Sequence, residues 1–562
     1  ARVVALGVAA GDFVNEGQWL MQLAPVDGAS AVAAETQAHD LDHIRADLQR
    51  VRDRDALLQD EARPAAVAKR HAAGGRTARE NVADLCDAGS FSEYGGYAIA
   101  AQTRRRTLDD LVRNTPADGM VTGIGTVNAA ADGPERSRTA VMAYDYTVLA
   151  GTQGWRNHHK KDRLLGLAHQ WRLPTVLFAE GGGGRPGDVD MPIVAGLNNH
   201  TFSQFAALSG KVPVVGVVHG RCFAGNAALL GCADVIIATA AANIGLGGPA
   251  MIEGGGLGVY RPEEIGPAKE QHHNGVVDLL VADEAAAVAA TKQYLGYFQG
   301  RHQHWQAGDA RTLRHLIPEN RLRVYDMRAV VAALADTGSV LELRAGFGAG
   351  MVTALARIEG QPVGIFANNP HHLGGAIDPE GADKAARFMQ LCNAHGIPLV
   401  SLCDTPGFMV GPEVERQAQV RHACRLFVTA AHLQVPCFTV VVRKGYGLGA
   451  QAMAVGGFDA PVFTVAWPTG EFGGMGLEGA VKLGFRKELE AAAVGAERDA
   501  LYQQLVARQY ANGSAINMAT TLEIDAVIDP ADTRGWIVRG LAGSGPARRG
   551  EQSPASRFVD PW

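Results

Sequence analysis

Two glycine-rich turns, far apart in the chain, look like copies of one structural device and constrain the fold most strongly. The first lies in VPVVGVVHGRCFAGNAALLGCADVII (residues 212–237), and the second lies in VPCFTVVVRKGYGLGAQAMAV (residues 435–455). Each segment is an apolar strand entered through Val-Pro, followed by a tight turn and a helix start rich in small residues. A duplication on this scale predicts repeated architecture, with two related domains in one chain.

The chemistry of such a turn comes from its backbone. A strand that enters a helix through glycines leaves several N–H groups directed into a cleft, and the helix dipole adds partial positive charge there. This arrangement suits the binding of a developing oxyanion. A single glycine turn has a simpler explanation, because glycine often only permits a tight turn. Two matching turns favour a reaction in which two oxyanions are stabilised.

Composition limits the classes of function. A chain of 562 residues, 47% of them apolar, is long enough for two large domains, or for three with a short appendage. The net charge of −6 argues against nucleic acid or an anionic membrane as a general partner. No run of 18 uninterrupted apolar residues is present, so we expect no membrane span. Seven scattered cysteines without CxxC spacing indicate reduced thiols and a cytoplasmic location.

The order of the apolar segments predicts an α/β fold. Strand-like runs such as MVTGIGTV and PTVLFAEGGGG alternate with helical stretches, and VTALARIEGQPVGIFANN and IPLVSLCDTPGF repeat the pattern later in the chain. This alternation is typical of largely parallel strands with helices packed outside them. We expect a first domain over residues 76–310, a second domain over residues 311–545 and a tail over residues 546–562.

The start of the chain has a different character. Residues 1–28 contain RVVALGVAAGDFVNEGQWLMQLAP, whose alternation of apolar and polar residues predicts two short strands around a hairpin. The segment resembles the second half of a biotinyl or lipoyl carrier domain, without the Met-Lys-Met hairpin of that family; an incidental hairpin is the alternative. We expect a remnant of a carrier domain in a fragment of a longer protein. Residues 29–75 are predicted to be a helical linker, with an apolar stripe at Leu41, Ile44, Leu48 and Val51.

From about Gly75 to Val538 the chain contains a series of ordered motifs: GGRTARENVADLCDAGSF, YTVLAGTQG, AEGGGGRPGD, GAIDPEGADKAARFMQLCNAHGIPLVSLCDTPGFMVG, VVVRKGYGLGAQAM and WPTGEFGGMGLEGAV. Together they resemble the carboxyltransferase component of biotin-dependent acyl-CoA carboxylases, the group that includes propionyl-CoA and methylcrotonyl-CoA carboxylases. The resemblance implies two crotonase-like (ClpP/crotonase) ββα-superhelix domains in tandem. It also implies a homohexamer, a dimer of trimers, with each active site between the first domain of one subunit and the second domain of another.

The resemblance implies transfer of a carboxyl group from N1-carboxybiotin to the α-carbon of an acyl-CoA thioester. Two oxyanions then need stabilisation, the thioester enolate and the ureido oxygen of biotin, and backbone N–H groups can supply it. By position, the family's oxyanion-binding pairs correspond to Ala224–Gly225 and Leu448–Gly449. Both pairs depart from the usual residues, and a shift of one position would make Asn226 or Gly447 the donor.

Other site residues follow from the same resemblance. The loop beside the first turn consists of Gly182, Gly183, Gly184 and Arg185. It is expected to face coenzyme A or its pantetheine arm. The alternative is a glycine turn in which Arg185 makes a structural salt bridge. Gln451 matches a position that lines the acyl pocket in the family.

Basic side chains near the two turns carry weaker expectations. Arg443 and Lys444 approach the second turn. Together with Gly447 of the turn itself, they are assigned to the biotin side, although a structural role for the two basic residues is equally compatible with the sequence. His219 precedes the first turn and is expected to be a structural donor rather than a base. The basic run His158–Lys161 is either a site for a phosphate of coenzyme A or a solvated face.

Partners and rival functions complete the expectations. Biotin would arrive on a carrier domain outside this fragment, loaded by a biotin carboxylase, and the carrier remnant favours a single-chain, long-chain acyl-CoA carboxylase. No metal-ligand spacing or Walker-type phosphate loop is present in the sequence. A crotonase-type hydratase or isomerase is one rival, but it would use side-chain carboxylates and need only one domain. A catalytically silent acyl-CoA-binding scaffold is the other, given the departures at Ala224 and Leu448.

Overall fold

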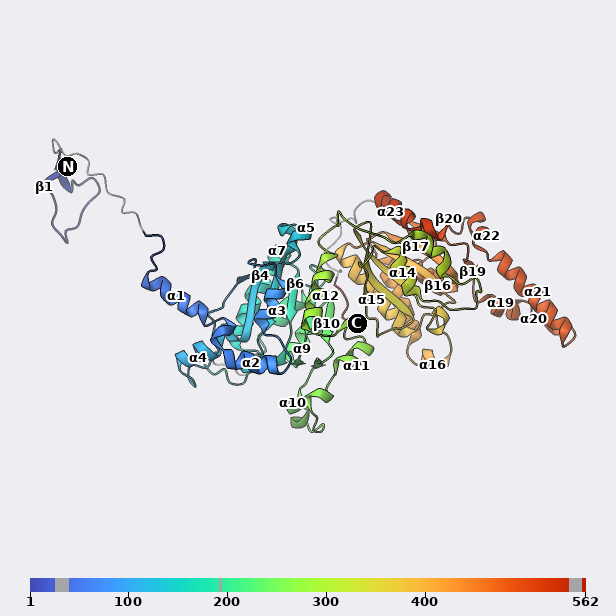
Figure 1. Ribbon diagram of the computed structural model, residues 1–562, viewed down its shortest axis with the longest axis horizontal. Helices are drawn as coiled ribbons and strands as arrows, with labels where there is room; N and C mark the ends of the chain where they lie inside the picture. Colours follow the sequence, from blue (N-terminus) through green and yellow to red (C-terminus); the bar gives the residue numbers. More distant parts are fainter. Residues whose placement is uncertain (26–39, 192–194, 545–557) are drawn as a thin grey trace. The chain divides into compact units, whose positions relative to one another are not determined.

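The computed structural model describes residues 1–25, 40–191, 195–544 and 558–562, which form two compact units, Ala1–Asp55 and Ala56–Trp562 (Figure 1). The small unit contains β1 (Arg2–Leu6), which pairs antiparallel with β2 (Met21–Ala24), so the predicted hairpin is confirmed. Helix α1 (Ala46–Ala56) begins later than the predicted apolar stripe. The end of the predicted carrier remnant and the start of the linker lie outside the described residues.

The first half of the large unit is built on a seven-stranded sheet. The strands follow the order β12-β10-β8-β6-β5-β4-β3, and only the pairs β5–β4 and β4–β3 are antiparallel. A separate three-stranded sheet follows the order β11-β9-β7. The strands are β3 (Ser92–Glu93), β4 (Met120–Thr126), β5 (Arg138–Tyr144), β6 (Thr175–Phe178), β7 (Gly181–Gly182), β8 (Val214–Val218), β9 (Arg221–Phe223), β10 (Val235–Thr239), β11 (Asn243–Gly245) and β12 (Leu279–Val281).

The second half repeats this plan. Its sheet follows the order β13-β14-β15-β16-β17-β18-β20; the first two pairs are antiparallel, the rest are parallel, and β19 pairs with the end of β17. The strands are β13 (Leu341–Leu343), β14 (Met351–Ile358), β15 (Gln361–Asn368), β16 (Leu399–Thr405), β17 (Cys437–Tyr446), β18 (Phe463–Ala466), β19 (Glu471–Gly473) and β20 (Ala526–Val527).

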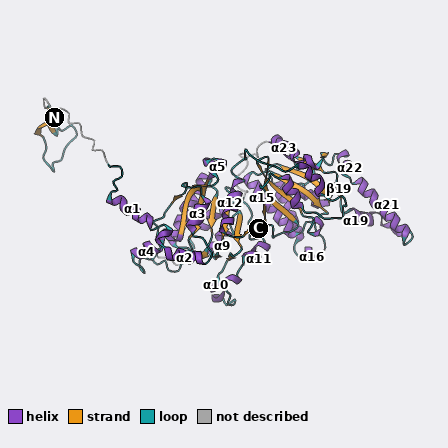
Figure 2. Ribbon diagram, viewed as in Figure 1, coloured by secondary structure: helices purple, strands orange, loops and turns teal. Residues whose placement is uncertain are grey.

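Helices surround both sheets (Figure 2). Those of the first half are α2 (Pro64–Ala72), α3 (Ala78–Leu85), α4 (Leu108–Asn114), α5 (Ala129–Asp132), α6 (Pro134–Ser137), α7 (Trp155–Trp171), α8 (Thr201–Ala206), α9 (Gly225–Leu230), α10 (Pro249–Gly254), α11 (Ala268–His273) and α12 (Glu284–Gly296). Those of the second half are α13 (Leu313–Leu316), α14 (Met327–Leu334), α15 (Pro379–His395), α16 (Pro412–Glu415), α17 (Gln419–Ala431), α18 (Gly447–Met453), α19 (Leu477–Gly484), α20 (Arg486–Ala491), α21 (Ala496–Asn512), α22 (Ala515–Thr520) and α23 (Thr533–Ser544).

Local sequence signals explain where the long helices begin and end. In α3 the Thr77 side chain accepts from the Glu80 N–H and the Glu80 carboxylate accepts from the Thr77 N–H, which is a complete capping box. Helix α15 begins with Asp378 as its cap and proline at the first helical position, and it ends at Gly396 with a φ of 73°. Both helices lie in motifs that carried the family resemblance.

The sheet of the second half is buried on both faces. Every residue of β14 is buried. Met351 and Val352, which are adjacent within this strand, belong to different hydrophobic clusters. Helix α15 contributes to the cluster of Met351, and helix α14 contributes to that of Val352. Continuous apolar strands are typical of sheets covered by helices on both sides. The two halves therefore have the crotonase-like ββα architecture that the resemblance implied.

The halves are joined by a shared core and by buried charges. The cluster that contains Met351 also contains Val235 and Tyr294 of the first half. Arg344 lies 3.0 Å from the Asp278 carboxylate, and both side chains are almost fully buried. Among the described residues, no helix has the length and apolar character needed to cross a membrane.

Candidate active site

Three chain segments meet at the carboxyl ends of the central strands in the first half. They are the turn Leu149–Gly151 after β5, the loop Gly181–Gly184 after β6, and the start of α9. The contact is close: a Cβ on Gly151 would lie 2.7 Å from the Glu180 carbonyl oxygen, and a Cβ on Gly181 would lie 2.3 Å from the Gly151 carbonyl oxygen. Only glycine permits this approach of one backbone to another.

The first of the two turns presents free backbone donors. Ala224 has φ 54° and ψ −125°, and its N–H donates to the Gly245 carbonyl over 3.0 Å. The N–H groups of Gly225 and Asn226 find no acceptor among the described residues, as expected at the start of a helix. Ala224 therefore shapes the turn. The unpaired donors are Gly225 and Asn226, one position further along the chain than the expected pair Ala224–Gly225, and Asn226 is the alternative that the sequence left open.

The glycine loop adds another donor to this turn. Gln153 N–H donates to the Gly183 carbonyl (2.7 Å) and Arg185 N–H donates to the Gln153 carbonyl (2.9 Å), so the Gly184 N–H lies on the opposite side of the loop. It has no acceptor within the described part of the chain. We call the N–H groups of Gly184, Gly225 and Asn226 the first nest.

The second turn has the same construction. Strand β17 runs directly into α18 through Gly447, which has a φ of 57°, and the N–H groups of Leu448 and Gly449 have no acceptor in the described structure. Across from them, the bridge between Ile377 and Phe408 leaves the Phe408 N–H without an acceptor among the described residues. The N–H groups of Phe408, Leu448 and Gly449 form the second nest.

Strand register defines which residues of the two nests correspond. Residues 221–223 pair in parallel with residues 243–245, and residues 444–446 pair in parallel with residues 471–473. Ala224 therefore corresponds to Gly447, Gly225 to Leu448 and Asn226 to Gly449. The two pairs expected from the sequence, Ala224–Gly225 and Leu448–Gly449, are offset by one position in this repeat. Their role as oxyanion donors stays a prediction.

A buried carboxylate lies beneath each nest. Glu180 lies two residues beyond Phe178 of β6, which pairs with β8. Asp404 lies two residues beyond Leu402 of β16, which pairs with β17. The two carboxylates therefore hold equivalent positions in the two halves. Arg70 donates to both Glu180 oxygens, at 2.7 and 3.0 Å. Burial of such charges is tolerated when they are paired.

His219 belongs to the buried cluster under the first nest. Its Nδ1 lies 3.0 Å from the Arg70 guanidinium, 3.6 Å from the Glu180 carboxylate and 3.5 Å from the Glu284 carboxylate. The imidazole is 3% exposed, which agrees with the expected structural role. Arg70 lies in α2, inside the predicted linker, so that helix is part of the larger unit.

Arg443 and Lys444 hold the loops under the second nest. The Arg443 guanidinium is 3.1 Å from the Asp404 carboxylate and donates to the carbonyls of Arg321 (3.2 Å) and Arg323 (2.7 Å). Lys444 Nζ donates to the Gly374 carbonyl and lies 3.5 Å from Asp404. These contacts support the structural alternative for both residues, and their predicted assignment to the biotin side stays a prediction.

Tyr325 completes the group around Asp404. Its hydroxyl donates to the Asp404 carboxylate over 2.7 Å. Burial and this neighbouring charge raise the pKa of Tyr325 far above its ordinary value. The phenol therefore remains a donor and stabilises the carboxylate.

Arg185 has the structural salt bridge that the sequence left open. Its guanidinium pairs with Asp118, lies 3.5 Å from Asp188 and donates to the Thr152 carbonyl (2.9 Å), and its side chain is 4% exposed. Burial raises the pKa of Asp118, and the Arg185 charge opposes that shift. The neighbouring Gly182 and Gly184 are exposed, so the loop rather than the arginine faces solvent.

Neither a phosphate site nor a solvated face, the two alternatives for residues 158–161, fits His158, Lys160 and Lys161, whose side chains are bonded inside the domain. Lys160 donates to the Ala117 carbonyl (2.9 Å), Lys161 donates to the Tyr144 hydroxyl (2.7 Å), and His158 contacts the Thr201 hydroxyl (3.0 Å). Burial lowers the pKa of Lys160 to about 8, that of Lys161 to about 7 and that of His158 to about 3. Side chains pulled into the domain in this way cannot bind a phosphate at the surface.

Two further residues that contact the nests, Gln153 and Phe408, carry no signal in the sequence. The Gln153 amide lies 3.2 Å from the position that a Cβ on Gly225 would occupy, and it donates to the Tyr144 hydroxyl over 2.9 Å. Phe408 belongs to the quoted motif DTPGF, yet a free N–H cannot be recognised from residue type. Gln451 and Leu448 are exposed on α18, so the second nest opens at the surface.

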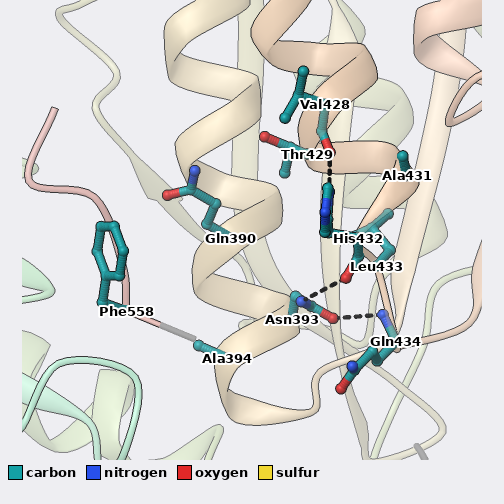
Figure 3. Close-up of a pocket in the computed structure, with 10 residues that line it drawn as sticks. All are labelled: Gln390, Asn393, Ala394, Val428, Thr429, Ala431, His432, Leu433, Gln434 and Phe558. Carbon is teal, nitrogen blue, oxygen red and sulfur yellow. Dashed lines mark hydrogen bonds between the residues drawn. The ribbon is translucent and has the colours of Figure 1, made fainter. Parts of the chain in front are cut away.

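A cavity of about 370 Å³ lies away from both nests (Figure 3). It is bounded by the ends of α15 and α17 and by Phe558. Asn393, one of its lining residues, donates to the His432 carbonyl (3.3 Å) and accepts from the Gln434 N–H (2.7 Å). Among the described residues, no group of three or more His, Cys, Asp or Glu side chains could hold a metal ion.

Comparison with protein families gives a match to the family described as "Carboxyl transferase domain" over residues 69–555. The chain is 32% identical over 490 residues to the methylmalonyl-CoA carboxyltransferase 12S subunit of Propionibacterium freudenreichii subsp. shermanii, covering 84% of this chain and 90% of that protein. It is 32% identical over 501 residues to the propionyl-CoA carboxylase beta chain of Saccharopolyspora erythraea, covering 85% of this chain and 89% of that protein.

Solved structures give the same picture. A single-chain, multi-domain long-chain acyl-CoA carboxylase is 60% identical with a TM-score of 0.85; the match covers 89% of this chain and 49% of that one, so this chain spans about half of its length. The transcarboxylase 12S hexamer, solved with methylmalonyl-coenzyme A and methylmalonic acid bound, is 30% identical with a TM-score of 0.78, covering 91% of this chain and 97% of that one.

Proposed function

The chain belongs to the carboxyl transferase family, and from this premise we propose that it transfers a carboxyl group from N1-carboxybiotin to the α-carbon of an acyl-CoA thioester. The observation that carries the proposal is the repeated nest. Within the part of the chain that the structure describes, each half has two N–H groups without an acceptor at a helix start. A third such N–H group, on a neighbouring loop, faces them. Two such sites match a reaction in which two oxygens acquire negative charge.

Each nest supplies backbone donors to one of these oxygens. Gly184, Gly225 and Asn226 stabilise the enolate oxygen of the thioester, while Phe408, Leu448 and Gly449 stabilise the ureido oxygen. Loss of one such donor costs about 2.7–4 kcal/mol of transition-state stabilisation in comparable enzymes. N1-carboxybiotin, when bound, supplies the carboxyl group and a ureido nitrogen that can accept the α-proton, so the chain needs no side-chain base.

The assignment of substrates and the assembly belong to the same proposal. Acyl-CoA lies against the first half of one subunit and biotin against the second half of another, within a homohexamer. The family relationship and the hexamer named for the transcarboxylase structure support this arrangement. The carrier and biotin carboxylase lie on the same polypeptide, as the single-chain neighbour suggests, and the substrate is a long-chain acyl-CoA.

The hydratase or isomerase alternative lacks support from the geometry. Its acid and base would be carboxylates at the nest. Glu180 is next to the glycine loop, but it is 3% exposed and paired with Arg70. Both oxygens of this carboxylate are bonded to the Arg70 guanidinium, so it is not placed to exchange a proton with a substrate.

The test is a transfer assay with the purified 562-residue chain. The protein is incubated with a 2-carboxyacyl-CoA and free biotin, and formation of the decarboxylated acyl-CoA is followed for acetyl-, propionyl-, butyryl- and palmitoyl-derived substrates. We expect turnover that depends on biotin and is fastest with the palmitoyl derivative. Hydration of an enoyl-CoA without any biotin-dependent turnover would overturn the proposal in favour of the first rival, and binding without turnover would overturn it in favour of a scaffold.

A further inference from the structure

The Asn226 side chain joins the three segments of the first nest. It is fully buried at the start of α9. Its Nδ2 donates to the Gly151 carbonyl (3.0 Å) and to the Glu180 carbonyl (2.7 Å), and its Oδ1 accepts from the Gly183 N–H (3.2 Å). A primary amide offers two donors and an acceptor on one small group, and this one uses all three functions.

These partners belong to the segments that carry the nest. Gly151 ends the turn after β5, and Gly183 directly precedes Gly184, whose N–H faces the nest. The backbone N–H of Gly225 is on the residue before Asn226. The Asn226 side chain therefore connects the start of α9, which carries the Gly225 donor, to the loop that carries the Gly184 donor. The distance between these two donors depends on that connection.

The second nest is held by a different device. Asn226 corresponds to Gly449, which has no side chain, and a Cβ there would lie 2.6 Å from the Gly407 Cα. The Gly407 N–H, the counterpart of the Gly183 N–H, instead donates to the Thr405 hydroxyl of its own loop over 3.1 Å. The helix and loop of the second nest are therefore in direct backbone contact, while those of the first are linked by a side chain.

We propose that Asn226 is a positioning residue whose side chain sets the placement of the Gly184 and Gly225 donors around the enolate oxygen. The inference rests on the proposed function and deepens it at one site. The Asn226 backbone N–H remains in any variant other than proline, so side-chain substitutions test the positioning role alone. Since the second nest has no equivalent amide, the effect is confined to the acyl-CoA half of the reaction.

The experiment compares Asn226→Ala and Asn226→Asp with the parent chain. Asn226→Asp keeps the size and the acceptor for the Gly183 N–H, but it turns an oxygen towards two carbonyl oxygens. We expect kcat for carboxyl transfer to fall by about 10-fold or more in Asn226→Ala and further in Asn226→Asp, because a misplaced donor is weakened rather than removed and full loss of one donor costs about 10²–10³-fold. The KM for acyl-CoA changes by less than about threefold, because the binding surface is unaltered.

A second readout separates positioning from general damage. Decarboxylation of carboxybiotin without acyl-CoA should proceed at the parent rate in both variants. The matched control is Gln299→Ala. This amide is also buried; it donates to the Val127 carbonyl (2.8 Å) and accepts from Asn128 (3.0 Å). Both partners follow β4, at the end of the sheet opposite to the nest. It should lose thermal stability without loss of kcat.

The outcomes are distinguishable. A parent chain without carboxyl transfer overturns the proposed function and this inference with it. A parent chain that transfers carboxyl groups, alongside Asn226 variants with unchanged kcat or with equal losses in both reactions, overturns the inference alone. If Asn226→Ala does not fold, the graded comparison uses Asn226→Ser and Asn226→Asp, and equal rates in these two also refute the positioning role.

Discussion

The Cα of Gly407 would lie 2.6 Å from a Cβ placed on Gly449, so loop and helix backbones touch where the second nest opens. The Phe408 backbone nitrogen is only 3.1 Å from the same point. No real Cβ makes contacts as short as the first of these with a backbone. Glycine at position 449 is therefore required by the geometry that brings the two sides of the nest together.

Gly449→Ala should move the loop of Gly407 away from α18. The backbone donors remain, but their spacing changes, so we expect a fall in carboxyl-transfer kcat of about 10-fold or more, smaller than the roughly 10²–10³-fold of a lost oxyanion donor. Steady-state kinetics with free biotin as acceptor measures this.

The control for that substitution is Gly166→Ala, on an exposed turn of α7 where an added Cβ meets nothing within 4 Å. This change should leave kcat intact and stabilise the chain by about 0.5–1 kcal/mol. Equal kinetics in both alanine variants would contradict the tight contact at Gly449.

Proline substitutions test which nest serves which oxygen. Gly225→Pro and Leu448→Pro remove equivalent N–H groups at helix starts, where proline is tolerated. We expect Gly225→Pro to slow exchange of the acyl-CoA α-proton and Leu448→Pro to slow carboxybiotin decarboxylation, each by about 10²–10³-fold. Position 448 is better suited than 449, where the proline ring would collide with Gly407.

Leu448→Ala provides the matched control, since it removes a side chain that is 63% exposed and keeps the N–H. Its rates should equal those of the parent. A large loss in Leu448→Ala, or equal losses of both partial reactions in the two proline variants, would argue against the division of labour between nests.

Assembly is tested by sedimentation. If each active site combines the first half of one subunit with the second half of another, the 59.2 kDa chain sediments as a hexamer, or at least as a dimer, under assay conditions. An active monomer in analytical ultracentrifugation would contradict the shared site.

Much of the fold could be predicted because its signals are local and repeated. The apolar runs at β14, β15 and β16 and the two glycine turns all lie where the sequence indicated. The linker was harder to delimit, because α2 is held to the larger unit by the ion pair between Arg70 and Glu180, which are 110 residues apart.

The site was less predictable because burial and hydrogen bonding decide it. Lys161 is a surface residue by type, yet it is fully buried against Tyr144. Ala224 was the expected donor by position, but its N–H is used by Gly245. The register between β9 and β11 that creates this bond is a tertiary feature, so the shift of one residue could not be read from the chain.

Ala224→Gly tests whether the departure from glycine at this position silences the enzyme. Ala224 has φ 54° and ψ −125°, a strained conformation that costs about 1–3 kcal/mol for a residue with a Cβ. Glycine relieves the strain but loses about 0.4–1 kcal/mol through the unfolded state, so a net gain in stability is expected. Because the N–H already donates to Gly245, kcat should change by less than about twofold, which is under about 0.5 kcal/mol. A large rise in activity would instead support a silent scaffold with a defective turn.

Lys161 should make stability depend on pH. Burial lowers its pKa from 10.5 to about 7 in the folded chain. Between about pH 7 and about pH 10.4 the unfolded chain therefore carries a proton on this residue that the folded chain lacks. Stability rises with pH across that window and is lowest below about pH 7, where both states are protonated. Denaturant unfolding at about pH 7, 8.5 and 10 should show a steeper rise for the parent chain than for Lys161→Met, and parallel curves would show that the ammonium keeps its charge in the folded core.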